Sequence, residues 1–160
     1  MIITDQGRNT SPAQARQLAA TADAATGIAF GSVVLTAQGE RAVETLSPGD
    51  RVITRDGIRR LTAAITDELT GTVVRISASA LGHDRPEADV LLAPGQLILL
   101  RDWRAQALYG QAAALVPVSR LTDGEYICVQ EARTIQVVTL CFEQPCVVYV
   151  NGLEVACPAG

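Results

Sequence analysis

Short apolar segments separated by turn residues make up most of the chain after residue 27. Examples are SVVLT before AQGE, RVIT before RDG, TVVRISAS before LGHDRPE and DVLLA before PGQ, and the same pattern continues in LILL, EYICV, TIQVVTLCF and CVVYV. The segments are rich in β-branched residues, and turn-forming residues stand between them, which is typical of short strands. The pattern therefore predicts an all-β domain over residues 27–160, in which Asn151-Gly152 forms a two-residue hairpin turn.

Helical periodicity is strongest near the N-terminus, in TSPAQARQLAATADAATG. Ser11 is a good N-cap residue, Pro12 suits the first helical position, and Gly27 can end the helix in the left-handed conformation. We therefore expect residues 1–26 to be an N-terminal extension with one α-helix over residues 12–25. The apolar face of this helix is weak and consists of Ala15, Leu18, Ala19 and Ala22. A second, weaker helical pattern falls around residues 104–114.

Two ten-residue segments of the chain resemble each other. LSPGDRVITR (46–55) and LTDGEYICVQ (121–130) each contain Leu, a Gly three residues later, an acidic residue and then a strand pattern. A match of this kind is expected from a sheet that is built of two similar halves.

Composition narrows the classes of function. A chain of 160 residues, 48% of them hydrophobic, can form one domain with its own core. The net charge of −4 disfavours a nucleic-acid partner, and six aromatic residues are too few for a base-stacking platform. No apolar run has the length of a membrane span, and the start MIITDQGRNT lacks the features of a secretory signal. We therefore expect a cytoplasmic protein with neither nucleic-acid nor membrane partners.

The cysteines and the single histidine do not suggest a metal site. In a reducing compartment Cys128, Cys141, Cys146 and Cys157 are expected to be thiols. Cys141 and Cys146, which flank FEQP, are interpreted as buried strand thiols, with a bridge across a bend or a reactive thiol as the alternatives. His83 lies in the polar loop GHDRPE, and one His without paired Cys spacing makes no zinc site. No metal and no cofactor is predicted.

The stretch GSVVLTAQGERAVETLSPGDRVITRDG resembles the opening of Hint (hedgehog/intein) domains, particularly the bacterial single-domain type. ALGHDRPEADVLLAPGQLILL and LYGQAAALVPVSRLTDGEYI resemble the middle of that family, and VVYVNGLEVAC resembles its C-terminal hairpin. The resemblance covers about residues 27–158. It implies an all-β, horseshoe-like disc of short strands with two pseudo-symmetric halves. The opening matches the family at Gly31, Ser32, Gly39, Val43, Glu44, Leu46, Gly49, Asp50 and Val52.

The resemblance also implies a chemistry, which is cleavage of the peptide bond before the first residue of the domain. A Cys or Ser at that residue attacks the preceding carbonyl, and a His in the middle strand polarises the amide or protonates its leaving nitrogen. Here Gly27 stands at the nucleophile position, or Ala29 if the register shifts by two, and Gln96 stands at the His position. Neither Gly nor Gln can perform these roles. Further family imidazoles would fall near Thr139 and Pro145, and both positions lack His.

We therefore expect a Hint-like domain that has lost autoprocessing and acts as a non-catalytic binding or interaction module. No catalytic residue is expected, and the partner would be a protein or a peptide. The alternative is residual self-cleavage by acyl shift near Thr26-Gly27, with an unrecognised nucleophile such as Ser32 or Cys146. Ser32 itself is interpreted as a turn residue. The sequence indicates no oligomeric state.

Overall fold

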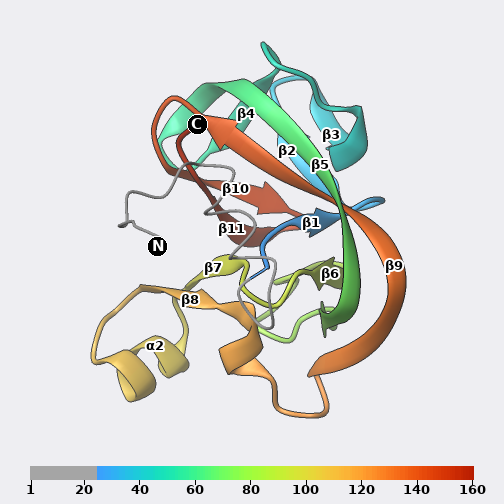
Figure 1. Ribbon diagram of the computed structural model, residues 1–160. Coiled ribbons are helices and arrows are strands. Elements are labelled where there is room, and N and C mark those ends of the chain that lie inside the picture. The colour runs from blue at the N-terminus through green and yellow to red at the C-terminus, as the bar shows by residue number, and fades with distance from the viewer. Residues whose placement is uncertain (1–24) are drawn as a thin grey trace, which may run out of the picture.

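The computed structural model describes residues 25–160, so the helix predicted over residues 12–25 lies outside the described residues except for Ala25. Within residues 25–160, eleven strands join in one sheet, which confirms the all-β prediction (Figure 1). The strands are β1 (Ile28–Ala29), β2 (Val33–Thr36), β3 (Gly39–Ala42), β4 (Arg51–Thr54), β5 (Gly57–Ile76), β6 (Val90–Leu92), β7 (Leu97–Leu100), β8 (Ala114–Pro117), β9 (Ile127–Phe142), β10 (Cys146–Val150) and β11 (Leu153–Cys157).

Two of the strands are much longer than the pattern predicts. β5 has 20 residues and β9 has 16, and they pair antiparallel from Leu61–Phe142 to Ile76–Ile127. The prediction from the sequence was wrong here, because it left LTAAITDELTG outside any strand and divided β9 into two. Two register shifts let the pair bend, and its outward positions can be polar. The pair runs along one side of the molecule, from β4, which pairs with the beginning of β5, to β6, which pairs with its end (Figure 1).

The short sequence repeat corresponds to one local structure that occurs twice. The 3₁₀ helix η2 (Val43–Thr45) precedes Gly49, which has φ +98°, and β4 follows. The 3₁₀ helix η3 (Val118–Leu121) precedes Gly124, which has φ +79°, and β9 follows. The valine that begins each 3₁₀ helix is fully buried. The two segments therefore share their fold as well as their sequence pattern.

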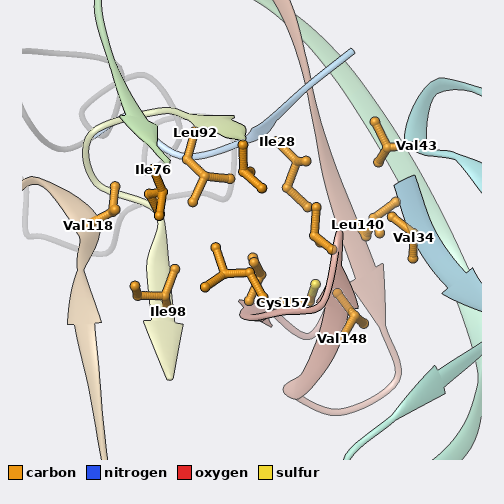
Figure 2. Close-up of a cluster of buried hydrophobic side chains, with 14 of the residues drawn as sticks. Ile28, Val34, Val43, Ile76, Leu92, Ile98, Val118, Leu140, Val148 and Cys157 are labelled. Atoms are coloured by element: carbon orange, nitrogen blue, oxygen red, sulfur yellow. The ribbon is translucent and has the colours of Figure 1, made fainter. Parts of the chain in front are cut away.

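The main core fixes the beginning of the described chain. Ile28 of β1 lies opposite Leu92 of β6 on one side and Val138 of β9 on the other. All three side chains are almost completely buried, and Figure 2 shows Ile28 and Leu92 in the same apolar cluster as Leu140. Because β1 is held between two strands, the residue before it, Gly27, also has a fixed position.

The second helical pattern is a short helix, α2 (Trp103–Tyr109), between β7 and β8. It begins where Asp102 Oδ1 accepts a 2.9 Å hydrogen bond from the Arg104 N–H, and it ends at Gly110 in the left-handed conformation. The helix is therefore shorter than the predicted range of 104–114. Among residues 25–160, no helix has the length and apolar character needed to cross a bilayer.

The C-terminal hairpin is formed as the sequence predicts. Asn151, with φ +49°, and Gly152, with φ +84°, make the two-residue turn between β10 and β11. The side chain of Asn151 also accepts a 2.9 Å hydrogen bond from the N–H of Val33 in β2. The turn is therefore tied to the opening of the β domain.

Candidate functional site

Gly27 and Gln96, the two positions singled out by the sequence, lie in direct contact. The backbone N–H of Gly27 donates a buried hydrogen bond of 2.9 Å to Oε1 of Gln96. The Nε2 group of Gln96 donates to the carbonyl oxygen of Ala156 at 2.8 Å and to that of Leu97 at 3.2 Å. The side-chain amide of Gln96 therefore has partners at both ends, and its oxygen is the atom that faces Gly27.

The side chain of Gln96 cannot act as the acid of this reaction. An amide nitrogen leaves readily only when it receives a proton, so a catalytic group at position 96 must be able to donate to the nitrogen of residue 27. The atom of Gln96 that faces this nitrogen is Oε1, which carries no proton, and the Nε2 group donates to backbone carbonyls. A carboxamide also has no ionisable proton near neutral pH. The side chain thus holds the backbone of Gly27 in place and offers it no acid.

The backbone on both sides of the Thr26–Gly27 bond is also held by the loop between β6 and β7. The carbonyl of Ala25 accepts a 2.7 Å hydrogen bond from the N–H of Gly95, and the carbonyl of Gly27 accepts a 3.0 Å hydrogen bond from the N–H of Ala93. Together with the bond to Gln96, three hydrogen bonds hold residues 25–27 along residues 93–96. We call this arrangement the backbone clamp.

A side chain at position 27 would have no space. Gly27 has φ +140°, a conformation that L-residues rarely adopt, and a Cβ there would lie 2.7 Å from Cγ2 and 2.8 Å from Cβ of Val137. Val137 belongs to β9 and is buried opposite Ala29 of β1. It occupies the volume that a nucleophilic side chain would need. The surrounding apolar cluster consists of Ala25, Leu69, Val73 and Ala93.

The family assignment follows from a comparison of the sequence with protein-family models. The model of the Hint domain matches residues 26–157. The chain belongs to the Hint domain family. The match begins one residue before Gly27, which agrees with the position of this residue at the start of the β domain.

Solved structures with the same fold include inteins. The bacterial intein-like domain from Clostridium thermocellum is 15% identical, with a TM-score of 0.57 over 81% of this chain and 96% of that one. The DnaB intein from Synechocystis is 14% identical, with a TM-score of 0.56 over 83% of this chain and 99% of that one. The gp41-1 intein is 10% identical, with a TM-score of 0.51 over 81% and 97%. A comparison with curated proteins finds no match.

Ser32 of the Hint domain lies in the turn after β1. Its N–H donates to the carbonyl of Ala29 at 3.2 Å, and its carbonyl accepts from Val43 at 2.8 Å. The buried side chain borders a shallow hollow of about 200 Å³, which Asp89 and Asn151 also line. Within residues 25–160, no hydrogen bond joins Ser32 to Gly27 or Gln96. The structure thus gives Ser32 a place in a turn, as the sequence suggested.

Cys146 lies at the start of β10, directly opposite Cys157 of β11. All four cysteines of the chain are thiols in the structure, and Cys141, Cys146 and Cys157 are buried. Burial raises the pKa of the Cys146 thiol to about 11 from an ordinary value of 9.0. Burial also raises the pKa of Cys157, and the neighbouring thiols of Cys146 and Cys141 add to this effect. The thiols of Cys146 and Cys157 are therefore almost entirely protonated near neutral pH.

His83 is exposed, and its Nε2 lies 3.4 Å from Oδ2 of the adjacent Asp84. Within residues 25–160, no hydrogen bond joins His83 to the residues of the backbone clamp. Among residues 25–160, no group of three or more His, Cys, Asp or Glu side chains could hold a metal ion.

A charge cluster that the sequence pattern does not predict surrounds the buried Glu154, on the strand after the hairpin turn. Glu154 of β11 is only 2% exposed and accepts hydrogen bonds from three arginines. Its Oε1 is 3.0 Å from Nη2 of Arg85 and 2.8 Å from Nε of Arg101, and its Oε2 is paired with Arg55. The side-chain hydrogen bond to Glu154 is the main cause that raises the pKa of Arg55. A Glu within the apolar strand LEVAC was the available signal.

Proposed function

We propose that this Hint domain has lost autoprocessing and acts as a non-catalytic interaction module for a protein or peptide partner. The observation that carries the proposal is the contact between Gly27 and Val137. A nucleophile at position 27 needs both a side chain and space for it, and Val137 fills that space. The acid is missing as well, because the carboxamide of Gln96 has no ionisable proton to give to the leaving nitrogen.

The two replacements support each other structurally. Gly27 allows β1 to approach β9 closely, and Gln96 satisfies the N–H group that this approach buries. A polar group left unpaired at this depth would cost roughly 1–3 kcal/mol. The former reaction centre therefore works as a fixed attachment between the start of the domain and its middle. In this proposal the domain keeps its N-terminal extension, and its function is to present a surface to a partner.

The alternative of residual self-cleavage at Thr26–Gly27 receives less support from the geometry. An acyl shift through Cys146 needs a thiolate, and burial keeps this thiol protonated near neutral pH. An acyl shift through Ser32 needs a base, and Ser32 has only backbone partners in the described residues.

The intact mass of freshly purified full-length protein tests the proposal. A single species of 16.9 kDa should persist for days, with or without hydroxylamine or a strong thiol. These reagents cut esters and thioesters and leave amides intact. A fragment that begins at Gly27, or close to it, would falsify the proposal and would support the alternative.

A variant that restores the missing parts makes the mass measurement decisive. We expect thiol-dependent cleavage before residue 27 only when Gly27→Cys and Gln96→His are combined with Val137→Ala. The same two substitutions with Val137 retained are the matched control, which should stay intact because the new side chain has no space. The proposal also keeps the cytoplasmic location expected from the sequence, which cell fractionation would test.

A further inference from the structure

The hairpin of β7 and β8 is apolar on both of its faces. The inward face consists of Ile98, Leu100, Ala114 and Val116, which belong to the main core or pack against it. On the outward face, Leu97 lies opposite Pro117 and Leu99 lies opposite Leu115. Leu97 and Leu115 are exposed, and the other two are partly exposed. A sheet that faces water on one side normally alternates apolar and polar residues, so this outward face is unusual.

The position of the hairpin makes this exposure more costly. β8 is the last strand in the sheet order, and within residues 25–160 it pairs only with β7. An apolar face next to an open strand edge tends to associate with other chains unless something covers it. We therefore expect a further segment of the chain, or another molecule, to cover this face.

The chain itself supplies a suitable segment at this position. The carbonyl of Ala25 is hydrogen-bonded to the N–H of Gly95 at 2.7 Å, and Gly95 lies two residues before Leu97. The chain before Ala25 therefore joins the domain close to Gly95, two residues before β7 begins. The sequence of residues 12–25 predicts a helix with one apolar face, and small alanines would allow that face to approach the sheet closely.

The dimensions of the two parts agree. A helix over residues 12–24 would be roughly 20 Å long, at about 1.5 Å per residue. The four residues of β7 extend over roughly 13 Å, at about 3.3 Å per residue. A helix that ends beside Gly95 and lies along β7 would thus be long enough to cover the outward face of the hairpin.

We propose that residues 12–24 form a helix that docks on the outward face of the β7–β8 hairpin. Leu18 and the alanines on its side of the helix would contact Leu97, Leu99 and Leu115. The docked helix would hold the chain before Ala25 in place, next to the backbone clamp. This inference does not depend on whether the domain has lost its chemistry.

Tryptic digestion of the full chain tests this docking. The chain contains no Lys, and residues 1–24 contain two cleavage sites, after Arg8 and after Arg16. Arg8 precedes the predicted helix and provides an internal reference, whereas Arg16 lies within it. Proteases cut extended backbone, so a docked helix must open before Arg16 is cut. We expect cleavage after Arg16 to be at least tenfold slower than cleavage after Arg8.

Substitutions on the receiving face supply the decisive comparison. Leu115→Ser should bring the rate at Arg16 close to that at Arg8. Ile58→Ser is the matched control, because Ile58 and Leu115 are both 51% exposed and Ile58 lies on β5, away from the hairpin. Equal rates at Arg16 in the two variants would overturn the proposal.

A second pair of variants tests the helix side. Ala22→Asp places a charge on the predicted apolar face, and Ala20→Asp places the same charge on the opposite face. Only Ala22→Asp should speed cleavage at Arg16. If both behave like the unsubstituted chain, the proposal fails. It fails as well if the protein is a dimer that Leu115→Ser dissociates without changing the rate at Arg16, because a second copy then covers the face.

Discussion

Gly27 and Val137 have complementary volumes, since a β-carbon on the first would lie 2.7 Å from Cγ2 of the second. The glycine therefore serves two purposes. It adopts φ +140° without strain, and it leaves room for the valine on the neighbouring strand. The absence of a side chain at position 27 therefore allows β9 to pack closely against β1.

We predict that Gly27→Ala destabilises the domain by on the order of 3 kcal/mol, because backbone strain and overpacking add together. Gly31→Ala is the control. Gly31 has φ +92°, and a β-carbon added to it would meet nothing within 4 Å, so only the strain of roughly 1 kcal/mol applies. Urea unfolding measures both. Val137→Ala in the Gly27→Ala background should recover part of the loss, and equal losses for the two glycine variants would exclude Val137 as the obstacle.

We predict that Glu154→Gln costs on the order of 2–3 kcal/mol, because three guanidinium groups lose their shared carboxylate. The loss should be below that of a fully buried pair, since the arginine side chains are partly exposed and can be solvated. Glu40→Gln, at an exposed position on β3, is the control. Added salt should narrow the difference by screening the repulsion between the arginines. Equal unfolding free energies for the two variants would contradict the prediction.

We predict that the protein loses stability between about pH 9 and pH 11. The folded state raises the pKa of Cys146 to about 11, whereas the unfolded thiol has an ordinary value of 9.0. The folded state thus binds this proton more tightly, so its stabilising effect is complete below pH 9 and is lost as the pH rises to 11. Cys157 acts in the same direction. The unfolding free energy of Cys146→Ala should depend less on pH in this range, and an unchanged slope would contradict the assignment.

We predict that one thiol per chain reacts quickly with a thiol reagent in the folded protein. Cys128 is partly exposed, whereas Cys141, Cys146 and Cys157 are buried. Labelling followed by peptide mass analysis should find the modification at Cys128, and the other three should react after unfolding in urea. Fast labelling of Cys146 in the folded state would revive its candidacy as a nucleophile.

The approach of Gly27 to Gln96 could be predicted from the sequence because both residues lie in segments that resemble family motifs. Val137 could not be predicted in this way. Its contact with Gly27 depends on the register between β1 and β9, and nothing in the local pattern of TIQVVTLCF sets that register. The hydrogen bonds donated by the backbone N–H groups of Ala93 and Gly95 could not be predicted either. Every residue except proline has such a group, so the residue type gives no signal.

Short apolar segments that end at clear turn residues, such as β4 and β10, can be predicted from the sequence nearly to the residue. β5 was not, because its middle carries Thr66, Asp67 and Glu68 in a pair of strands that bends and faces solvent. These three residues are polar because this part of the strand pair faces solvent, and the strand continues through them. The burial of Glu154 also depends on tertiary structure. Three arginines that are far from it in the sequence neutralise its carboxylate in the fold.

The position of β1 between β6 and β9 has a consequence for biosynthesis. Val138, a partner of Ile28, is synthesised roughly a hundred residues after it. At typical synthesis rates of about 5–20 residues per second, that interval is on the order of ten seconds. Until β9 has been synthesised, β1 therefore lacks its partner on that side, and this part of the sheet cannot close.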